Sequence, residues 1–366
     1  MKIGFAHPNK RNYSETFIQY HIDYLKPVFV LTGGKRPYED QDGVSIFTFP
    51  FSEPIRIFVK RLLPGLYGRF FTYFLSRYLQ KQRPDILLVE YGTTGCGVVD
   101  ACIKTNTPLA VHFHGFDAFE NKTVESHLKE YQKIFKYAKA IIGVSRDMVE
   151  RLVELGAPRE KVHFVSCGVK THEFFGAEPA KSDKLVLAVG RFAGKKAPHL
   201  TIKAFNLVLN KHPDAQLIMI GQGALFASCQ ALVEELQLKH AVKLLGVKTP
   251  VEVAEYLRKA RLFVQHSMFN PENNDSEGTP TSILEAASAG LPIVSTRHAG
   301  IKDAVEHGVT GFLVEEGDYE SMAGFISILL EDALLAAEMG EKGREKMQKE
   351  YTMEIQTQKL LNAINL

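Results

Sequence analysis

Two glutamates, Glu277 and Glu285, stand eight positions apart around a segment that is typical of a helix start. Residues 278–282 between them comprise a glycine, a proline and three hydroxyl side chains, and a small-residue helix then ends at Gly290. The first amides of a helix lack intrahelical partners and carry a positive dipole end, which favours a phosphate group. Carboxylates accept hydrogen bonds from sugar and ribose hydroxyls. The segment therefore predicts a site where a phosphate and sugar hydroxyls meet.

A purely structural role explains part of this segment equally well. Ser282-x-x-Glu285 matches a capping box, and Pro280 suits the first turn of a helix. Glu285 is therefore either a helix cap or a ligand contact. Glu277 lies in the loop before the helix, where capping does not explain it.

Two cations follow a buried strand. Residues 185–189 read as a strand leading into Gly190 and Arg191, and Lys196 precedes a helix that begins near Pro198. Arg191 and Lys196 therefore emerge at the carboxyl end of a strand, where ligands bind in α/β sheets. A forked guanidinium and a compact ammonium suit a diphosphate, although a solvated pair of loop charges is the alternative.

Glycines end two other strands. Gly221 and Gly223 follow the apolar run 216–220, where they either approach a ligand or simply turn the chain. Residues 92–97 follow the strand 86–89 in a similar way, but they lack the spacing of a dinucleotide-binding fingerprint.

His112 and His114 share one face of a strand by alternation, and Asp117 lies just beyond its end. Two histidines on one strand lack the further ligands that a metal needs, so we predict no metal site. We expect His112 to be a core residue and His114, followed by a glycine, to reach a substrate hydroxyl. Ser14 and Glu15 follow the first strand and start a helix, so they are candidates for the acceptor side, with capping as the alternative role of Ser14.

A basic, aromatic stretch covers residues 55–83. Cations interleave there with aromatic side chains, and residues 54–84 contain no acid. The net charge of the whole chain is only +2, which argues against nucleic acid as a partner. An anionic membrane surface fits better, while aromatics facing the core and cations facing water is the structural alternative.

The order of elements predicts an α/β protein with two parallel sheets. Short apolar runs alternate with longer periodic segments, which indicates strands covered by helices. The polar segment 176–183 is the most linker-like part of the chain. We therefore expect one domain over 1–175, completed by the C-terminal helix 353–366, and a second over 176–352. Two such domains would face each other across a cleft.

Composition places the chain among cytoplasmic proteins. Hydrophobic residues make up 45% of the 366 and charged residues 23%, and no apolar run approaches the length of a membrane span. The first apolar run, residues 3–7, is too short for a signal peptide. The four cysteines have no paired spacing, so neither a disulfide framework nor zinc is predicted from them.

In these motifs the sequence resembles glycosyltransferase family 4, the retaining nucleotide-sugar transferases of the GT-B fold. The resemblance rests on segments that cover nearly the whole second domain in order: 190–196, 221–223, 277–285, 285–294, 300–305 and 308–314. In the first domain it is looser and rests on 14–17, 92–95 and 114–117, which resemble members that build bacterial exopolysaccharides and cell-surface glycans.

The resemblance implies that 1–175 is the acceptor-side domain and 176–352 the nucleotide-sugar domain, and it implies a role for each matching residue. Arg191 and Lys196 would bind the donor diphosphate, Glu277 the donor sugar and Glu285 the ribose. The donor-binding set also includes Gly221, Gly223, Gly278, Thr279, Thr281 and Ser282, and the catalytic set is Glu277, His114, Arg191 and Lys196. The sequence departs from the family at 279–281, where Thr-Pro-Thr replaces Phe-Gly-Leu and the proline removes one amide donor. It also departs at 9–14, where the usual glycine-rich turn is missing.

The expected function is transfer of a sugar from a nucleoside diphosphate, uridine before guanosine, to a carbohydrate or lipid-linked acceptor hydroxyl with retention. No metal or other cofactor is expected. The protein would be cytoplasmic or peripheral on the inner face of the membrane. A non-catalytic sugar-nucleotide-binding subunit and a nucleotide-sugar epimerase are the alternatives.

Overall fold

The computed structural model describes residues 1–9, 16–48 and 52–365, and the chain divides into two compact units. Unit 1 comprises Met1–Val165 and Thr357–Leu366, and unit 2 comprises Ser166–Gln356. The boundary predicted at 175/176 thus lies further along the chain than the division at 165/166. Among the described residues, no helix has the length and apolarity needed to cross a membrane.

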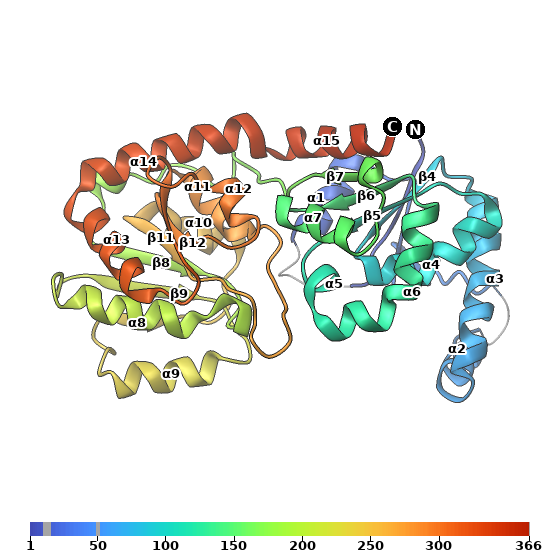
Figure 1. Cartoon of the computed structure of the whole chain (residues 1–366), viewed down its shortest axis with the longest axis horizontal. Helices are drawn as coiled ribbons and strands as arrows, with labels where there is room; N and C mark the ends of the chain where they lie inside the picture. The colour runs from blue at the N-terminus through green and yellow to red at the C-terminus, as the bar shows by residue number, and fades with distance from the viewer. Residues whose placement is uncertain (10–15, 49–51, 366) are drawn as a thin grey trace. The chain divides into compact units, whose positions relative to one another are not determined.

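Unit 1 is a seven-stranded sheet covered by helices (Figure 1). Its strand order is β3-β2-β1-β4-β5-β6-β7, and all pairs are parallel except β2 with β3. The strands are β1 (Ile3–Ala6), β2 (Phe29–Thr32), β3 (Glu39–Asp40), β4 (Ile86–Glu90), β5 (Leu109–Phe113), β6 (Ala140–Gly143) and β7 (Val162–Phe164). The helices are α1 (Thr16–Leu25), α2 (Ser52–Leu62), α3 (Pro64–Gln82), α4 (Gly92–Thr105), α5 (Phe116–Phe119), α6 (Asn121–Tyr137) and α7 (Arg146–Glu154). Most of α15 (Met353–Asn365) also belongs to unit 1.

Unit 2 is a six-stranded sheet of order β10-β9-β8-β11-β12-β13, parallel throughout. Its strands are β8 (Leu185–Val189), β9 (Gln216–Ile220), β10 (Val242–Leu244), β11 (Leu262–Gln265), β12 (Ile293–Thr296) and β13 (Gly311–Val314). Its helices are α8 (Pro198–Leu209), α9 (Phe226–Glu235), α10 (Pro250–Lys259), α11 (Thr281–Ala289), α12 (Ile301–Ala304), α13 (Tyr319–Glu331) and α14 (Ala333–Lys346). In both sheets the strand order reverses beside the first strand, β1 in unit 1 and β8 in unit 2. This position is the switch point of doubly wound folds.

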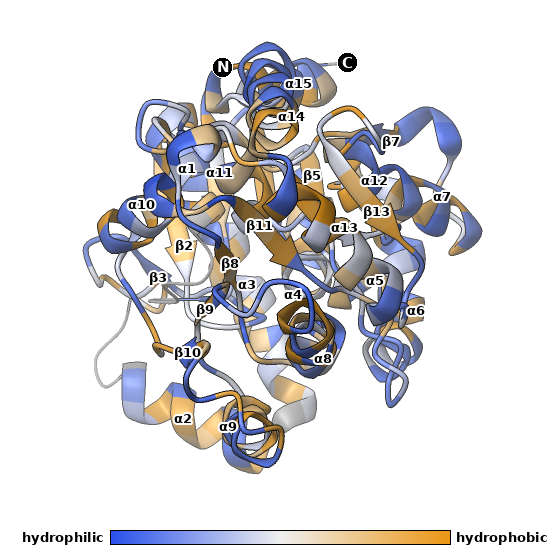
Figure 2. Ribbon diagram, turned by 90° about the vertical axis from the view of Figure 1, so that its left-hand side faces the viewer, coloured by the Kyte–Doolittle hydropathy of each residue, from blue (hydrophilic) through white to orange (hydrophobic). Residues whose placement is uncertain are grey.

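Buried apolar strands hold each sheet between its helices. In β4 and β5 almost every aliphatic side chain is excluded from solvent, as expected for strands covered on both faces. In unit 2 the central strand β11 is hydrophobic and is coloured orange in Figure 2. Its Leu262 and Val264 belong to a buried cluster shared with α8 and α13. This packing fixes the strand ends, from which the polar loops emerge.

The helix α4 was not predicted from the sequence. The glycines of 92–97, which were expected either to approach a ligand or to turn the chain, lie in the first turns of this helix. A Cβ added at Gly92 would lie 2.1 Å from the ring of Phe113, and one at Gly97 would lie 2.0 Å from the carbonyl oxygen of Lys35. Close approach, and not conformational freedom, therefore explains these two glycines.

The basic, aromatic stretch divides between two helices. In α3, Tyr67 and Phe71 are buried, so the structural alternative holds for these aromatics. In α2, by contrast, Ile57, Phe58 and Leu62 are each more than half exposed. An apolar surface of unit 1 therefore lies on α2.

Candidate active site

The candidate site of unit 2 lies at the carboxyl ends of β8, β9 and β11. A small pocket there is lined by residues that include Gly190, Arg191, Lys196 and Gln265. A larger pocket of about 520 Å³ opens near Leu185 and Gln216, where β8 and β9 begin. We favour the smaller one, since open α/β sheets bind ligands at the carboxyl ends of their strands.

Lys196 and Glu277 form a buried ion pair at this site. The Lys196 Nζ lies 3.1 Å from Glu277 Oε2, and the two side chains are 11% and 10% exposed. Burial raises the pKa of Glu277, but Lys196 and Lys195 outweigh it and bring that pKa to about 2. Glu277 Oε1 has no hydrogen-bond partner among the described residues. Glu277 is thus a carboxylate with one oxygen able to accept a hydroxyl donor.

Lys195 secures the loop that carries Glu277. Its Nζ lies 3.1 Å from Asp275 Oδ1 and donates to the carbonyl oxygen of Ser276 at 2.9 Å. The sequence singled out Lys196 of this lysine pair and left Lys195 without a role. The structure makes Lys195 the more buried residue, with contacts to the loop backbone.

The helix α11 starts without a side-chain cap, so the capping-box interpretation is wrong. Pro280 is the N-cap residue, and no side chain accepts a bond from the first turn. Ser282 Oγ donates to Gln265 Oε1 at 2.9 Å. Glu285 is therefore not explained as a capping residue. Burial, with a smaller contribution from Glu173, raises its pKa to about 7.

Close approach of the backbone of two loops explains the two glycines that follow β9. At Gly221 (φ +141°) a Cβ would lie 1.9 Å from the carbonyl oxygen of Gly190. At Gly223 (φ +156°) it would lie 2.5 Å from that of Phe192. These glycines bring the β9 loop against the loop that holds Arg191, and donor contact by either glycine stays a prediction.

Gly300 packs directly against the segment 278–281. The Gly300 amide donates to the Gly278 carbonyl oxygen at 3.0 Å, and a Cβ at Gly300 would meet Thr279 Oγ1 at 2.1 Å. Gly278 and Thr279 are buried, and Thr281 opens α11. Their contacts with a donor stay predictions.

A histidine–carboxylate pair next to Glu277, His298 with Glu316, was not predicted from the sequence. The Glu277 amide donates to His298 Nε2 at 3.3 Å, and His298 Nδ1 lies 2.6 Å from Glu316 Oε1. Because the amide can only donate, His298 Nε2 accepts and its Nδ1–H donates to Glu316. Glu316 also accepts from the Phe269 amide at 3.0 Å, so the pair joins both ends of the loop 269–277.

The candidates of unit 1 lie at the end of β5. His114 Nε2 is 2.5 Å from Glu90 Oε2, and the His114 side chain is only 5% exposed. Asp117 is fully buried and accepts from the amides of Gly92, His114 and Gly115 at 2.8, 3.0 and 3.0 Å. Burial raises the pKa of Asp117, although His114 and these amides oppose it. Asp117 thus shapes the turn after β5, and an acceptor contact by Asp117 stays a prediction.

Glu90 is a buried carboxylate that the sequence interpretation overlooked. It ends the apolar strand β4, where a charged residue after Ile-Leu-Leu-Val was the available signal. Burial raises its pKa, but His21, His112 and His114 outweigh burial and hold that pKa well below its usual value. His112 is a core residue, as predicted, with no exposed surface. Ser14 and Glu15 lie outside the residues that the structure describes.

Family models match both halves of the chain. The model described as "Glycosyl transferases group 1" matches residues 169–346, and the one described as "Glycosyltransferase Family 4" matches residues 27–173. The chain belongs to glycosyltransferase family 4. The two matches together run from the early strands of unit 1 to α14 of unit 2.

Two curated relatives are similar to this glycosyltransferase over most of its length. The amylovoran biosynthesis glycosyltransferase AmsK of Erwinia amylovora is 29% identical over 276 residues, which are 74% of this chain and 67% of AmsK. The putative colanic acid biosynthesis glycosyltransferase WcaL of Escherichia coli K12 is 27% identical over 290 residues, or 77% of this chain and 70% of WcaL.

A solved structure shares the fold. HepE of Anabaena, in complex with UDP, superposes with a TM-score of 0.78 at 16% identity and with full coverage of both chains. The two parallel-sheet, Rossmann-like units and this likeness confirm the predicted GT-B fold.

Proposed function

We propose that this glycosyltransferase moves a sugar from a nucleoside diphosphate to an acceptor hydroxyl with retention at the anomeric carbon. The observation that supports it most is the buried Lys196–Glu277 pair beside Arg191 at the carboxyl end of β8. The pair sets a cation for a phosphate next to a carboxylate for a sugar hydroxyl.

In the proposed reaction no covalent bond forms between the sugar and the protein. The bond from the anomeric carbon to the diphosphate oxygen breaks, the bond to the acceptor oxygen forms on the same face, and the acceptor proton passes to the leaving phosphate. Negative charge grows on the leaving diphosphate, and Arg191, Lys196 and the first amides of α11 would stabilise it. Glu277 would orient the sugar, and Glu285 would accept from the ribose hydroxyls. His114 is proposed as a further contact of the donor sugar on the strength of the family resemblance.

The donor would be a uridine nucleotide and the product part of a surface polysaccharide. HepE has been crystallised with UDP and with UDP-glucose, and AmsK and WcaL are named for amylovoran and colanic acid biosynthesis. We extend both features to this chain as proposals: a UDP-hexose donor and a glycan or lipid-linked acceptor used at the inner face of the membrane. No metal is assigned to the transfer step.

A thermal-shift screen followed by a transfer assay tests the proposal. A donor that binds only the native state raises its unfolding midpoint. We expect one UDP-sugar to do so more than its GDP counterpart, and the purified chain to consume it with an acceptor while the product keeps the donor's anomeric configuration by NMR. Sugar conversion without an acceptor would indicate an epimerase, and binding without turnover would indicate a non-catalytic subunit. Either result would overturn the proposed activity.

Membrane contact through α2 is the second part of the proposal. Ile57, Phe58 and Leu62 are 54%, 54% and 60% exposed, and Lys60 and Arg61 accompany them on the same helix. Exposed apolar residues beside cations favour the surface of an anionic bilayer. Arg56 does not join this surface, because it is buried and pairs with Glu53 at 2.7 Å.

We predict that the chain sediments with vesicles containing phosphatidylglycerol at low salt but not with pure phosphatidylcholine. The double change Phe58→Ser with Leu62→Ser should lower the vesicle partition coefficient by about 100-fold or more, since each buried apolar side chain contributes roughly 1.5–3 kcal/mol. Leu334→Ser is the matched control, because Leu334 is 77% exposed on unit 2. Equal sedimentation of all three proteins, or none, would remove this part of the proposal.

A further inference from the structure

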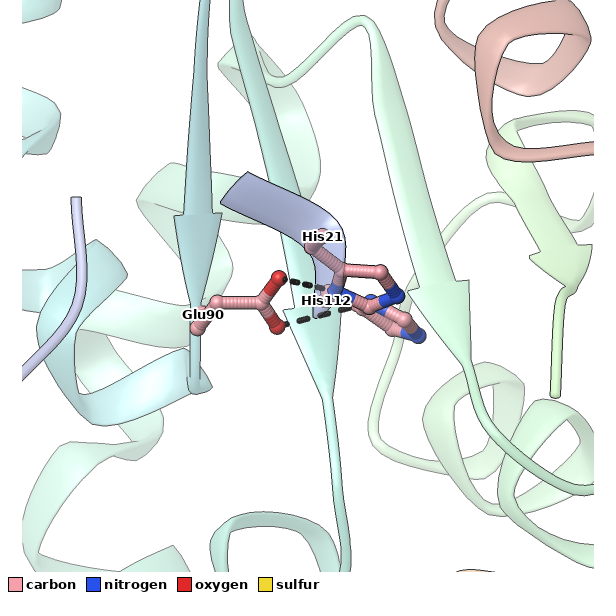
Figure 3. Close-up of side chains that lie close together, drawn as sticks. All are labelled: His21, Glu90 and His112. Carbon is pink, nitrogen blue, oxygen red and sulfur yellow. Dashed lines mark hydrogen bonds and ion pairs between the residues drawn. The ribbon is translucent and has the colours of Figure 1, made fainter. Parts of the chain in front are cut away.

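Three elements of unit 1 bring nitrogen and oxygen ligands together inside the protein. Glu90 ends β4, His112 lies on the neighbouring β5, and His21 comes from α1 (Figure 3). One ligand atom from each lies within 4.8 Å of the others, and all three residues are buried. The sequence alone could not predict this cluster, because α1 and β4 are far from β5 along the chain.

The carboxylate of Glu90 faces the rings of both His21 and His112 (Figure 3). Its Oε1 is 2.8 Å from His21 Nδ1, and its Oε2 is 3.5 Å from His112 Nδ1. A third histidine reaches the same carboxylate, since His114 Nε2 lies 2.5 Å from Oε2. Two ligands of a tetrahedral zinc ion, each at about 2.0–2.2 Å from the metal, stand roughly 3.3 Å apart. The spacing of His112 Nδ1 from Glu90 is close to that value, whereas the two shorter spacings are hydrogen-bond distances.

The two nitrogens of His112 both face oxygen atoms that accept. Its Nε2 lies 3.3 Å from the carbonyl oxygen of Val165, and its Nδ1 faces the Glu90 carboxylate without a hydrogen bond. A neutral imidazole carries one N–H, and in His112 the Val165 carbonyl oxygen places it at Nε2, which donates to that oxygen. The Nδ1 lone pair then points towards a carboxylate, which is unfavourable unless a cation lies between them.

This arrangement is the one that metal-binding histidines usually have. A histidine that binds a metal through one ring nitrogen commonly donates the other N–H to a backbone carbonyl, which fixes the tautomer. His112 has that donor-side partner in Val165. Imidazole and carboxylate ligands together suit zinc and other first-row divalent ions, and not the oxygen-only coordination of magnesium or calcium.

We propose that His21, Glu90 and His112 bind one divalent transition-metal ion, zinc first among them. The ion would be structural. It would join α1, β4 and β5 and compensate the buried carboxylate. The proposal is independent of the sugar transfer, and it assigns the ion no part in that reaction.

Metal analysis of the full-length protein tests the proposal. After dialysis against metal-free buffer, we expect about one zinc ion per chain, as in structural zinc sites. Glu90→Gln and His112→Gln should lose the metal, whereas His172→Gln, a control at an exposed histidine of 69% side-chain exposure, should retain it. A chelator should lower the unfolding midpoint of the wild type and of the control but not of the two metal-free variants.

Cobalt substitution gives a measurement that needs no variant. Cobalt(II) added to the chelator-treated wild type should give the intense visible bands of a four-coordinate site, and zinc should displace them. Absence of zinc from the wild type together with absence of these bands would overturn the proposal. Metal that remains in Glu90→Gln and His112→Gln would also overturn it, because the ion would then bind elsewhere.

Discussion

Individual residues of unit 2 carry charge where stability does not require it. Lys196 and Glu277 are both buried, and taking two charges out of water costs about as much as their attraction returns. Such a pair is weak support for the fold and better support for a site that needs both charges in place. The same reasoning applies to Lys195 with Asp275 on the loop that presents Glu277.

Lys196→Ala should lower turnover by about 100- to 1000-fold, because one charge that stabilises the leaving group is lost. Glu277→Ala should have an effect of similar size, chiefly on kcat. Lys184→Ala is the control, since Lys184 pairs with exposed Asp214 at 2.9 Å just before β8. Wild-type transfer rates in both Lys196→Ala and Glu277→Ala, measured on folded protein, would show that the pair is not part of the site.

Glu285 should make stability fall as pH rises towards neutrality. Its pKa is about 7 in the folded protein, above the usual 4.5, so the folded state holds the proton that the unfolded state has lost. The penalty is absent below pH 4.5, grows between there and pH 7, and reaches on the order of 1–3 kcal/mol above that. Glu285→Gln should therefore raise the unfolding midpoint at pH 8 and leave it nearly unchanged at pH 4.

Differential scanning calorimetry at the two pH values makes the measurement. Exposed Glu331→Gln serves as the control and should not produce a pH-dependent difference from the wild type. A Glu285→Gln midpoint that follows the wild type at every pH would contradict a raised pKa.

At the level of elements, the loop 269–277 after β11 depends on contacts from the next two strands of the sheet. His298 follows β12 and Glu316 follows β13, and together they hold the amides of Glu277 and Phe269. These contacts act together with those of Lys195 to Asp275 and Ser276. A side chain on such a loop keeps its position only while those contacts hold.

His298→Ala should lower kcat/KM by about 10- to 100-fold, although every catalytic side chain is still present in this variant. The reason is that the Glu277 amide loses its hydrogen bond to His298, so Glu277 is no longer held in position. His298→Asn should recover part of the loss, since its amide oxygen can accept from the Glu277 amide. His240→Ala, at an exposed histidine, is the control. A fall in the unfolding midpoint with unchanged kcat and KM would mean that His298 serves only the fold.

At the level of the whole molecule, unit 1 is assembled from both ends of the chain. Residues 357–366 belong to it, and Leu360 and Ile364 of α15 have no exposed surface. Leu360→Ala should therefore destabilise the protein by about 2–5 kcal/mol. Urea unfolding, monitored by the tyrosine fluorescence of unit 1, would measure this loss of unfolding free energy. Leu334→Ala is the control, because Leu334 is exposed. A change below 0.5 kcal/mol, the range of ordinary surface substitutions, would show that α15 is dispensable to the unit.

Much of this architecture was predictable because its signals are local. The strands 185–189 and 216–220 were predicted with their observed bounds, since uninterrupted aliphatic runs are typical of buried parallel strands. The capping box considered at Ser282 does not form, because Ser282 bonds to Gln265 of a neighbouring strand. Glu90, His21 and the His298–Glu316 pair were missed for the same reason: their partners lie 69 and 18 residues away, and no local pattern joins them.

The return of the chain to unit 1 also sets an order of events during synthesis. The ribosome delivers Met1–Val165 first, then all of Ser166–Gln356, and only then the segment that completes the first core. Unit 2 is contiguous and can fold while still tethered, whereas unit 1 waits with the surface for Leu360 and Ile364 uncovered. Of the two units, the nascent first one therefore exposes apolar core surface for longest during synthesis, so it is the one that we expect a chaperone to bind.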